Sequence, residues 1–323
     1  MPIFTSGRIS HNIQSVEASL QATQQQEQVT ILDIKKQVAQ AYITVLRTES
    51  AAQVAQSHVD SLAAHDRDVS NLYAQEMVAR NDLLAAGVEL ADAQQRVVQA
   101  ENQLDIARSQ YNQLLNRPLH TAVELVPKFP DIPANSLAGL TQQALNKRPE
   151  IVVLSRQIES LEQQAQSIKA DLLSQVTING GYQYQENRYQ AFEGMWKAGV
   201  GIEWKLFDGS TRHKSESVIR QAIALKEQRD DLSSQIALQV RQAWLEIQET
   251  QKRIEVTRQA IAQAEENMKV TADRYREGLS NNTDVLRAEY LRTVTHDNFN
   301  NASYNHSQAK VNLRRALGDL LLC

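Results

Sequence analysis

Apolar residues recur at intervals of seven through much of the second half of the chain. One seam contains Val240, Ile247, Ile254, Ile261, Met268 and Tyr275. A second seam of Ile, Ala and Thr runs beside it, displaced by three or four residues. Sustained heptads of this kind predict helices that pack as coiled coils. The first copy repeats the pattern from Ile34 to Tyr73, broken only at Asp66, and residues 8–72 contain neither proline nor glycine. They predict one helix of ~65 residues, which at ~1.5 Å per residue is ~95 Å long.

The heptad pattern occurs twice because the sequence is duplicated. A shift of 202 positions places the segment that begins at Gln37 (QVAQAY) on the segment that begins at Gln239 (QVRQAW), and it superposes Tyr73 on Tyr275. A repeat of this length indicates two copies of one large unit, rather than a solenoid of short repeats. We therefore expect two antiparallel helical hairpins, residues 8–117 and 208–318.

Each hairpin is expected to reverse at a compact turn. In the second copy, Gly278 suits the left-handed conformation that follows many helices, and Thr283 is the expected cap of the next helix. In the first copy, Glu76 stands at the position of Gly278, so this turn lacks an obvious left-handed residue, and Asn81 is the expected cap. An aspartate follows in the first turn of each second helix, where a carboxylate faces the positive end of the helix dipole.

The composition changes twice between the two hairpins. Residues 118–148 contain four of the six prolines and a short amphipathic segment, which together predict an equatorial loop and a short helix. A further helix is expected over 149–174, because Pro149 suits a first helical position. Residues 175–207 predict a β-hairpin, residues 1–7 the end of another strand, and residues 319–323 a C-terminal tail.

The predicted β-hairpin has one apolar face and one polar face. The second strand, expected over 197–207, carries Lys197, Glu203 and Lys205 on its polar face. The apolar face of the two strands holds Val176, Ile178, Tyr182, Tyr184, Ala198, Val200, Ile202, Trp204 and Leu206. No other segment is available to cover that face. Strands of about 9–11 residues with this alternation are typical of an outer-membrane barrel with a wet interior.

Composition excludes several classes of protein. The net charge of −4 and the lack of a basic run give no positively charged surface for nucleic acid. The single cysteine, Cys323, excludes an internal disulfide framework. No nucleophile elbow, phosphate-binding loop or metal-ligand cluster occurs, so we expect neither an enzyme nor a cofactor. His58 and His65, seven residues apart, could bind a metal, but a solvated helix face is the preferred interpretation and no metal site is expected.

The chain resembles the TolC-like outer-membrane efflux proteins, the outer membrane factors. The resemblance rests on the duplication, the two turns, the strand-to-helix joints at 2–8 and 205–212, and the segment 144–151 around Pro149. It implies a mostly α fold of long coiled-coil hairpins in two repeats. It also implies a homotrimer in which four strands from each protomer form a shared twelve-stranded transmembrane β-barrel, with the long helices forming a periplasmic tunnel.

The resemblance also implies a function and a compartment. Proteins of this family are passive exit ducts of tripartite efflux pumps or type I secretion systems in the outer membrane of Gram-negative bacteria. The expected partners are two further copies of the chain, outer-membrane lipid, a periplasmic adaptor and, through the adaptor, an inner-membrane transporter. The alternative is that the chain is itself a periplasmic coiled-coil adaptor or scaffold.

Several site residues are expected from the turns and the strands. The resemblance places Asp82, Asp284 and Tyr275 at the tunnel mouth. The alternatives are that the two carboxylates only stabilise the first turns of their helices and that Tyr275 is a core residue. Arg287 stands where the family often has an acid, so Asp284 should be partly neutralised and Asp82 should be the stronger cation site. Apolar tips suggest docking of a partner; the docking residues expected are Met77, Val78, Gly278, Leu279 and Ser280. In the barrel, Lys197, Glu203 and Lys205 would face the lumen.

The chain departs from the family plan at its start. By comparison with the second half, ~70 residues that precede the first joint, and a signal peptide, are expected to be missing, which predicts an N-terminally truncated first repeat. Ser174 stands where the family usually has proline before the strand.

Overall fold

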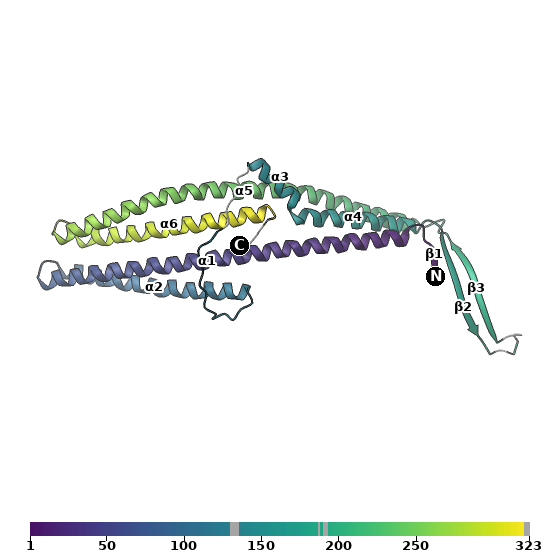
Figure 1. Cartoon of the computed structure of the whole chain (residues 1–323), viewed down its shortest axis with the longest axis horizontal. Coiled ribbons are helices and arrows are strands. Elements are labelled where there is room, and N and C mark those ends of the chain that lie inside the picture. Colours follow the sequence, from purple (N-terminus) through teal and green to yellow (C-terminus); the bar gives the residue numbers. More distant parts are fainter. Residues whose placement is uncertain (130–135, 187, 190–192, 320–323) are drawn as a thin grey trace. The chain divides into compact units, whose positions relative to one another are not determined.

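A computed structural model describes residues 1–129, 136–186, 188–189 and 193–319 of the chain. Its elements follow the predicted order (Figure 1). They are β1 (Pro2–Phe4), α1 (Arg8–Ala74), α2 (Arg80–Leu114), α3 (Leu137–Lys147), α4 (Pro149–Ala170), β2 (Gln175–Tyr184), β3 (Gly194–Glu203), α5 (Gly209–Arg276) and α6 (Asn282–Ala316). The helix α1 contains 67 residues and α5 contains 68, so each is one continuous helix.

The duplication is visible in the helix ends. The helix α2 begins at Arg80 and ends at Leu114, and α6 begins at Asn282 and ends at Ala316, so both ends differ by the 202 positions found in the sequence. The chain divides into two compact units, which are described separately: residues 1–31 with 145–237, and residues 32–144 with 238–323.

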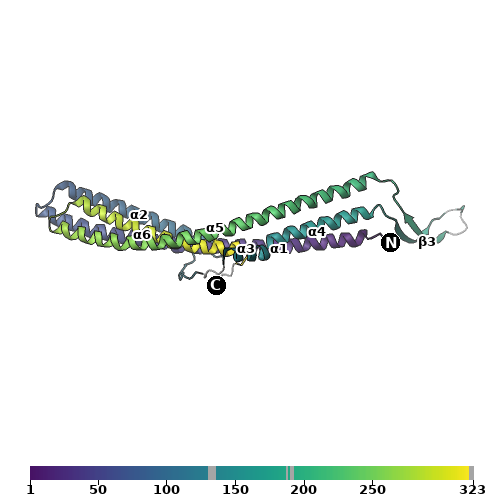
Figure 2. The same ribbon diagram turned by 90° about the horizontal axis from the view of Figure 1, so that it is seen from above.

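The unit of residues 32–144 and 238–319 is a pair of helical hairpins, one formed by α1 and α2 and the other by α5 and α6 (Figures 1 and 2). Small buried residues line the second helix of each hairpin and let its partner approach closely. On α2 these are Ala86, Ala93 and Ala107, and on α6 they are Ala288, Ala302, Ala309 and Ala316. Larger buried side chains of α1 and α5, such as Val45 and Val240, complete these seams.

The two hairpins contact each other along α1 and α6, and near the turns through α2 and α5 as well. Ala39 and Ile43 of α1 pack against Val311 of α6. Nearby, the Ser50 Oγ and Tyr304 Oη atoms lie 2.7 Å apart, within hydrogen-bond distance. The contact therefore mixes apolar packing with specific polar pairs.

The loop that follows α2 is tied back to the helices by buried polar groups. Asn112 is fully buried, and its side-chain amide donates to the carbonyls of Leu119 (3.1 Å) and Thr121 (2.8 Å). Further along, the Tyr42 hydroxyl donates to the carbonyl of Val126, and the Tyr42 ring meets Phe129 edge-on. These contacts hold residues 119–129 against the flank of α1 and α2.

The unit of residues 1–31 and 145–237 combines three helical segments with a small sheet. The helix α4 lies between the start of α1 and the start of α5: Ser160 Oγ is 3.1 Å from Ser15 Oγ, and Ser215 Oγ donates to the Ala165 carbonyl at 3.0 Å. Asp208 caps α5. Hydrogen bonds from the side chains of Thr211 and Ser210 and from the Thr211 backbone lower the pKa of Asp208 to about 2.

The sheet has the order β1-β2-β3 and is antiparallel throughout. The register pairs Val176 with Ile202, Ile178 with Val200 and Tyr182 with Trp196. Residues directly opposite each other share a face, so the apolar face predicted from the sequence is present. The second strand was expected over 197–207, but β3 begins at Gly194 and ends at Glu203. Trp204 lies past the ladder, where its indole N–H donates to the Leu172 carbonyl at 3.1 Å.

Candidate functional site at the hairpin turns

The two turns have the same backbone geometry although their residues differ. In the second turn Gly278 has φ 74°, its N–H donates to the Tyr275 carbonyl, and the Leu279 N–H donates to the Arg274 carbonyl. In the first turn Glu76 has φ 59°, and the corresponding bonds run from Glu76 to Tyr73 and from Met77 to Leu72. Both are Schellman motifs. The left-handed residue that the first turn lacked in sequence is therefore Glu76 itself.

Both helix caps expected from the sequence are wrong: in the second turn the cap lies two residues earlier, and in the first turn no side chain caps the helix. The cap of α6 is Asn281, not Thr283: the Asn281 side chain accepts a hydrogen bond from the Asp284 N–H at 2.9 Å. The helix α2 begins after Ala79, which offers no side-chain cap, so Asn81 is already inside the helix. In the second turn, Asn281 and Thr283 both have side chains that suit a cap, and the position of the turn decided in favour of Asn281.

A buried polar link joins the two turns. His65 Nε2 lies 2.7 Å from Asn282 Oδ1, and the Asn282 amide donates to the Asp82 carbonyl at 3.1 Å. Both side chains are buried. The expectation that His65 and His58 lie on a solvated face is therefore wrong, because α6 covers that stripe of α1.

Tyr275 belongs to the core beside this link. It is 7% exposed and packs with Val69, Ala86 and Val285, and its ring centroid is 5.3 Å from that of His65. Among the described residues its hydroxyl has no hydrogen-bond partner. Burial, together with the negative charges of Asp82 and Asp68, raises the pKa of the Tyr275 phenol. Within this chain Tyr275 is thus a packing residue.

The charged residues expected at the tunnel mouth lie around the same turns. Asp82 is half-buried, whereas Asp284 and Arg287 are exposed. The Asp284 carboxylate accepts a hydrogen bond from the Ser280 hydroxyl at 3.1 Å. No ion pair between Asp284 and Arg287 forms among the described residues, although both line a groove of about 360 Å³ between α5 and α6.

The residues expected to dock a partner divide into two groups. Met77 and Leu279 are exposed by 65% and 64%, and each follows the left-handed residue of its turn. Val78 instead packs against the cluster that contains Val69 and Val285. Ser280 is half-buried, and its hydroxyl donates a hydrogen bond to the Asp284 carboxylate. Gly278 is exposed as well, and among these five residues Met77 and Leu279 are the ones with large apolar side chains that the described residues leave exposed.

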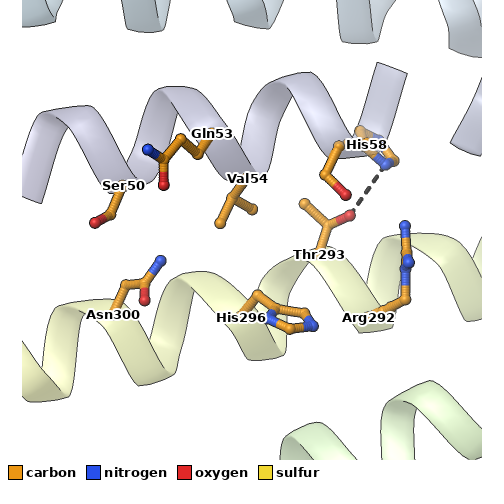
Figure 3. Close-up of a pocket in the computed structure, with 9 residues that line it drawn as sticks. Ser50, Gln53, Val54, His58, Arg292, Thr293, His296 and Asn300 are labelled. Atoms are coloured by element: carbon orange, nitrogen blue, oxygen red, sulfur yellow. Dashed lines mark hydrogen bonds between the residues drawn. The ribbon is translucent and has the colours of Figure 1, made fainter. Parts of the chain in front are cut away.

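A second polar cluster, which the sequence did not indicate, lies further along the contact between α1 and α6 (Figure 3). His58 Nδ1 is 3.1 Å from the carboxylate of Glu289 and 3.0 Å from the hydroxyl of Thr293. Arg292 donates to the same carboxylate at 2.8 Å. Beside this cluster is a pocket of about 220 Å³, and its lining residues include Val54, His296 and Asn300.

Glu289 is the most deeply buried charged group of this cluster, with 1% exposure. Burial alone would raise its pKa, but hydrogen bonds from His58 and Arg292 outweigh that effect, and the pKa of Glu289 lies below its usual value. Neighbouring Asp297 has a raised pKa because burial dominates there. Within the described residues no group of three or more His, Cys, Asp or Glu side chains is arranged to hold a metal ion.

The polar residues of the strand pair are placed as follows. Lys197 lies opposite Gly181 and donates to the side chain of Gln183, and Glu203 lies opposite Gln175. Lys205 follows β3 and is exposed. Lys197 and Glu203 therefore share the polar face of the hairpin, and Lys205 stands outside the ladder.

The chain belongs to the outer membrane efflux protein family, whose model matches residues 1–117 and 140–319. This membership identifies the protein as a component of an outer-membrane efflux channel, with its large helical portion in the periplasm. The predicted resemblance, mostly α fold class and compartment are confirmed, and the family is one of channels rather than enzymes. No curated protein sequence matches the chain.

Solved structures of outer-membrane channels share the fold. The outer-membrane channel OprN has a TM-score of 0.85 and 22% identity, over 97% of this chain and 72% of that chain. The outer membrane protein VceC from Vibrio cholerae has a TM-score of 0.83 and 18% identity, over 97% of this chain and 76% of that chain. CusC has a TM-score of 0.87 and 17% identity, over 97% of this chain and 75% of that chain. No described helix is long and apolar enough to cross a membrane.

Proposed function

We propose that the protein, as a homotrimer, is the passive exit duct of a tripartite efflux pump or a type I secretion system. The observation that carries this proposal is the pair of matched turns, each of which presents one exposed apolar side chain, Met77 or Leu279. Folding does not require apolar residues at these tips, and exposed apolar groups of this kind mark contacts with other proteins. The proposed partner is a periplasmic adaptor, which connects the duct to an inner-membrane transporter.

Assembly into a trimer is supported by an unpartnered apolar stripe on the first part of α1. Ile9, Ile13, Val16 and Leu20 are all exposed and are spaced by four, three and four residues. This is the spacing of a coiled-coil seam, which is stable only when a further helix covers it. Helices of neighbouring copies are the proposed cover.

The strand pair is proposed to contact lipid and to contribute to a shared membrane-spanning barrel. Ten residues in each of β2 and β3 suit the thickness of an outer membrane. Val200 and Ile202 lie on the exposed apolar face, with Tyr182 and Trp196 toward one end and Trp204 past the other. Aromatic residues at both ends of an apolar band are typical of such strands. Lys197, Glu203 and Lys205 would then face a wet interior.

The tunnel mouth is proposed to lie at the turns, with Asp82 and Asp284 as its acidic groups. Three copies of each carboxylate around a narrow opening would attract cations. Arg287 lies three residues beyond Asp284, so its charge reduces the local field of Asp284 more than that of Asp82. We expect Asp82 to be the stronger cation site, and Tyr275 to act by packing behind it.

The proposal is tested by efflux of a fluorescent dye from cells that lack the chromosomal gene and carry a plasmid copy. Met77→Asp together with Leu279→Asp should abolish efflux, because a desolvated carboxylate at each tip opposes docking, while the amount of protein in the outer membrane stays normal. The control is Leu119→Asp, which changes another exposed leucine, in the loop after α2. Normal efflux by the double tip variant would rule out docking at the turns.

A further inference from the structure

Basic residues occupy the ends of the helices that adjoin the strand pair (Figure 1). Arg8 is the first residue of α1, and Lys169 lies in the last turn of α4. Lys205 lies in the short connection between β3 and α5, and Arg212 and Lys214 lie near the start of α5. All five belong to the compact unit of residues 1–31 and 145–237, and all except half-buried Arg8 are exposed. These five residues are called the basic joint.

Contacts between the helices bring the basic joint to one level of this unit. The Ser215 hydroxyl of α5 donates to the Ala165 carbonyl of α4, and the Ser167 hydroxyl of α4 donates to the Arg8 carbonyl, both at 3.0 Å. The helix α4 runs towards the strands, whereas α1 and α5 run away from them. Lys169, near the end of α4, therefore lies at the level of the first turns of α1 and α5.

Most cations of the basic joint have no acidic partner. Among the described residues, no ion pair forms at four of the five, which are Lys169, Lys205, Arg212 and Lys214. Further along α5 the basic residues are paired: Arg220 lies 3.8 Å from Glu216, and Lys226 lies 2.6 Å from Glu162. The lack of partners is thus a property of the joint, and α5 as a whole does not share it.

The carboxylates near the joint do not neutralise these cations. Asp171 pairs with Arg8 at 3.3 Å, and Asp208 accepts the hydrogen bonds that cap α5. Exposed Glu203, at the end of β3, remains against the four unpaired cations. Basic residues at the start of a helix also oppose the positive end of its dipole, and the first turns of α1 and α5 contain no acidic residue. Helix stability therefore does not account for the basic joint.

Large apolar side chains accompany the basic joint and are exposed. Lys205 stands between Trp204 and Leu206 in the sequence, and the next residue, Phe207, is 100% exposed. Leu173, which follows α4, is exposed as well. Aromatic residues are enriched where a protein crosses from lipid to water, and basic residues beside a membrane attract anionic lipid. The joint has both features.

We propose that the basic joint binds the phosphate groups of anionic phospholipids in the leaflet next to the helices. The proposal rests on the membrane contact of the strand pair in the proposed function, and it adds the class of lipid and the residues that select it. Lys205, Arg212 and Lys214 contact the phosphates, while Trp204 and Phe207 lie at the boundary of the acyl chains. Because the whole chain has a net charge of −4, attraction to an anionic lipid requires a local group of cations such as this one.

The test uses the full chain reconstituted in phosphatidylethanolamine vesicles. The chain has three tryptophans, so Trp196→Phe with Trp244→Phe leaves Trp204 as the reporter beside Lys205. Brominated phosphatidylglycerol should quench Trp204 fluorescence more strongly than brominated phosphatidylcholine at the same mole fraction, by roughly twofold or more, because the cations concentrate the anionic lipid. High salt should reduce this preference.

Two triple variants that remove the same charge separate the joint from the rest of the chain. Lys205→Gln, Arg212→Gln and Lys214→Gln together should make quenching by the two lipids equal, with quenching by phosphatidylcholine unchanged. The matched control removes three exposed cations of α5 in the other compact unit, by Arg241→Gln, Lys252→Gln and Lys269→Gln. The control should keep the full preference, and loss of the preference in both triple variants would assign it to overall charge and overturn the basic joint.

The same measurement distinguishes failure of this inference from failure of the proposed function. If both lipids quench Trp204 equally in the chain with an intact joint, the strand pair contacts lipid as proposed and the selection of anionic lipid is wrong. If neither lipid quenches Trp204, the strand pair does not enter the membrane, and both proposals fail. Inorganic phosphate added at constant ionic strength should leave the preference intact; its loss would show that the joint binds free phosphate instead of lipid.

Discussion

The first and second hairpins have the same backbone and different chemistry. Both turns are Schellman motifs with a left-handed residue at the same place, yet one uses Glu76 and the other Gly278. The second helix of one hairpin is capped by Asn281, while that of the other begins after Ala79 without a side-chain cap. The comparison shows that backbone hydrogen bonds and small-residue seams set the shape of each hairpin. Individual side chains then adjust stability and contacts.

The two sequence repeats differ in the chemistry of the residues at the contact between the hairpins. On the α1 and α6 side it contains His58, Glu289 and Thr293, whereas the corresponding positions of the other copy hold Ala260, Gly87 and Ala91. A buried ion pair contributes little net stability, but it penalises any arrangement that leaves one partner alone. The polar cluster therefore specifies how one hairpin lies against the other within a chain.

The largest expected effect is that of Glu289→Ala, which leaves His58 and Arg292 without their shared carboxylate. Removal of one partner of a buried pair costs about 3–5 kcal/mol, so a marked fall in thermal midpoint is expected in detergent. The matched change in the other copy is Gly87→Ala, whose new Cβ would lie 3.9 Å from the nearest neighbouring atom, an Asp66 oxygen. That variant should be neutral or slightly more stable. Equal destabilisation of both would contradict a special role for the cluster.

The pH dependence of the same contact has a definite sign. The folded pKa of Glu289 lies below its ordinary value of 4.5, so its stabilising contribution is present above that value and is lost as the pH falls through the folded pKa. Asp297, whose pKa is raised by burial, contributes in the opposite direction. The difference in thermal midpoint between the wild type and Glu289→Gln isolates the first group. This difference should hold above pH 4.5 and shrink as the pH falls below that value towards the folded pKa of Glu289; a difference that stays constant below pH 4.5 would argue against an ionised Glu289.

The two turns offer a reciprocal pair of substitutions. Gly278→Val places a β-branched residue at φ 74° and should cost on the order of 1–2 kcal/mol. Glu76→Gly removes a side chain from φ 59° and should stabilise the first turn by roughly 1 kcal/mol. Hydrogen exchange of the amides of Leu279 and Met77 reports each turn separately. The idea of a shared geometry would fail if Glu76→Gly loosened its turn.

The helix caps allow a similar exchange at smaller scale. Asn281→Ala removes the acceptor for the Asp284 N–H and should destabilise the start of α6 by about 1 kcal/mol. Ala79 has φ −81° and ψ 156°, the backbone conformation of a cap residue, so Ala79→Asn should stabilise the start of α2 by up to about 1 kcal/mol. Amide exchange in the first turn of each helix measures both effects, with Thr283→Ala as the control that should change nothing.

The smallest structural change is expected from neutralising the aspartates at the proposed tunnel mouth. Asp82→Asn should relieve the block of single-channel current by multivalent cations more than Asp284→Asn, because we propose that the charge of Arg287, three residues beyond Asp284, weakens the field of Asp284. Neither change should alter the fold, since Asp284 is exposed and the Asn282 amide binds the backbone carbonyl of Asp82 rather than its carboxylate. A block relieved only by Asp284→Asn would reverse the assignment, and a block that survives both changes would remove the acidic ring.

The sequence by itself determined the long helices, their duplication and the two faces of the strand pair. Heptads without proline or glycine predict a continuous helix, and α1 and α5 are each continuous through their heptads. The offset of 202 positions between the two sequence repeats is also the offset between α2 and α6, which begin and end 202 positions apart. Alternation in β2 and β3 fixed which residues share a face. These features depend only on neighbours within one element.

Only the tertiary structure decided what each side chain meets. His58 and His65 were expected in solvent because their own helix gives no sign of cover. Their partners Glu289 and Asn282 lie more than 200 residues away in sequence, on α6. Glu76 takes a left-handed conformation, and Asn281 rather than Thr283 caps α6, because the packing of two helices fixes where each turn must close. A local pattern specifies an element, but burial and hydrogen-bond partners depend on which elements come together.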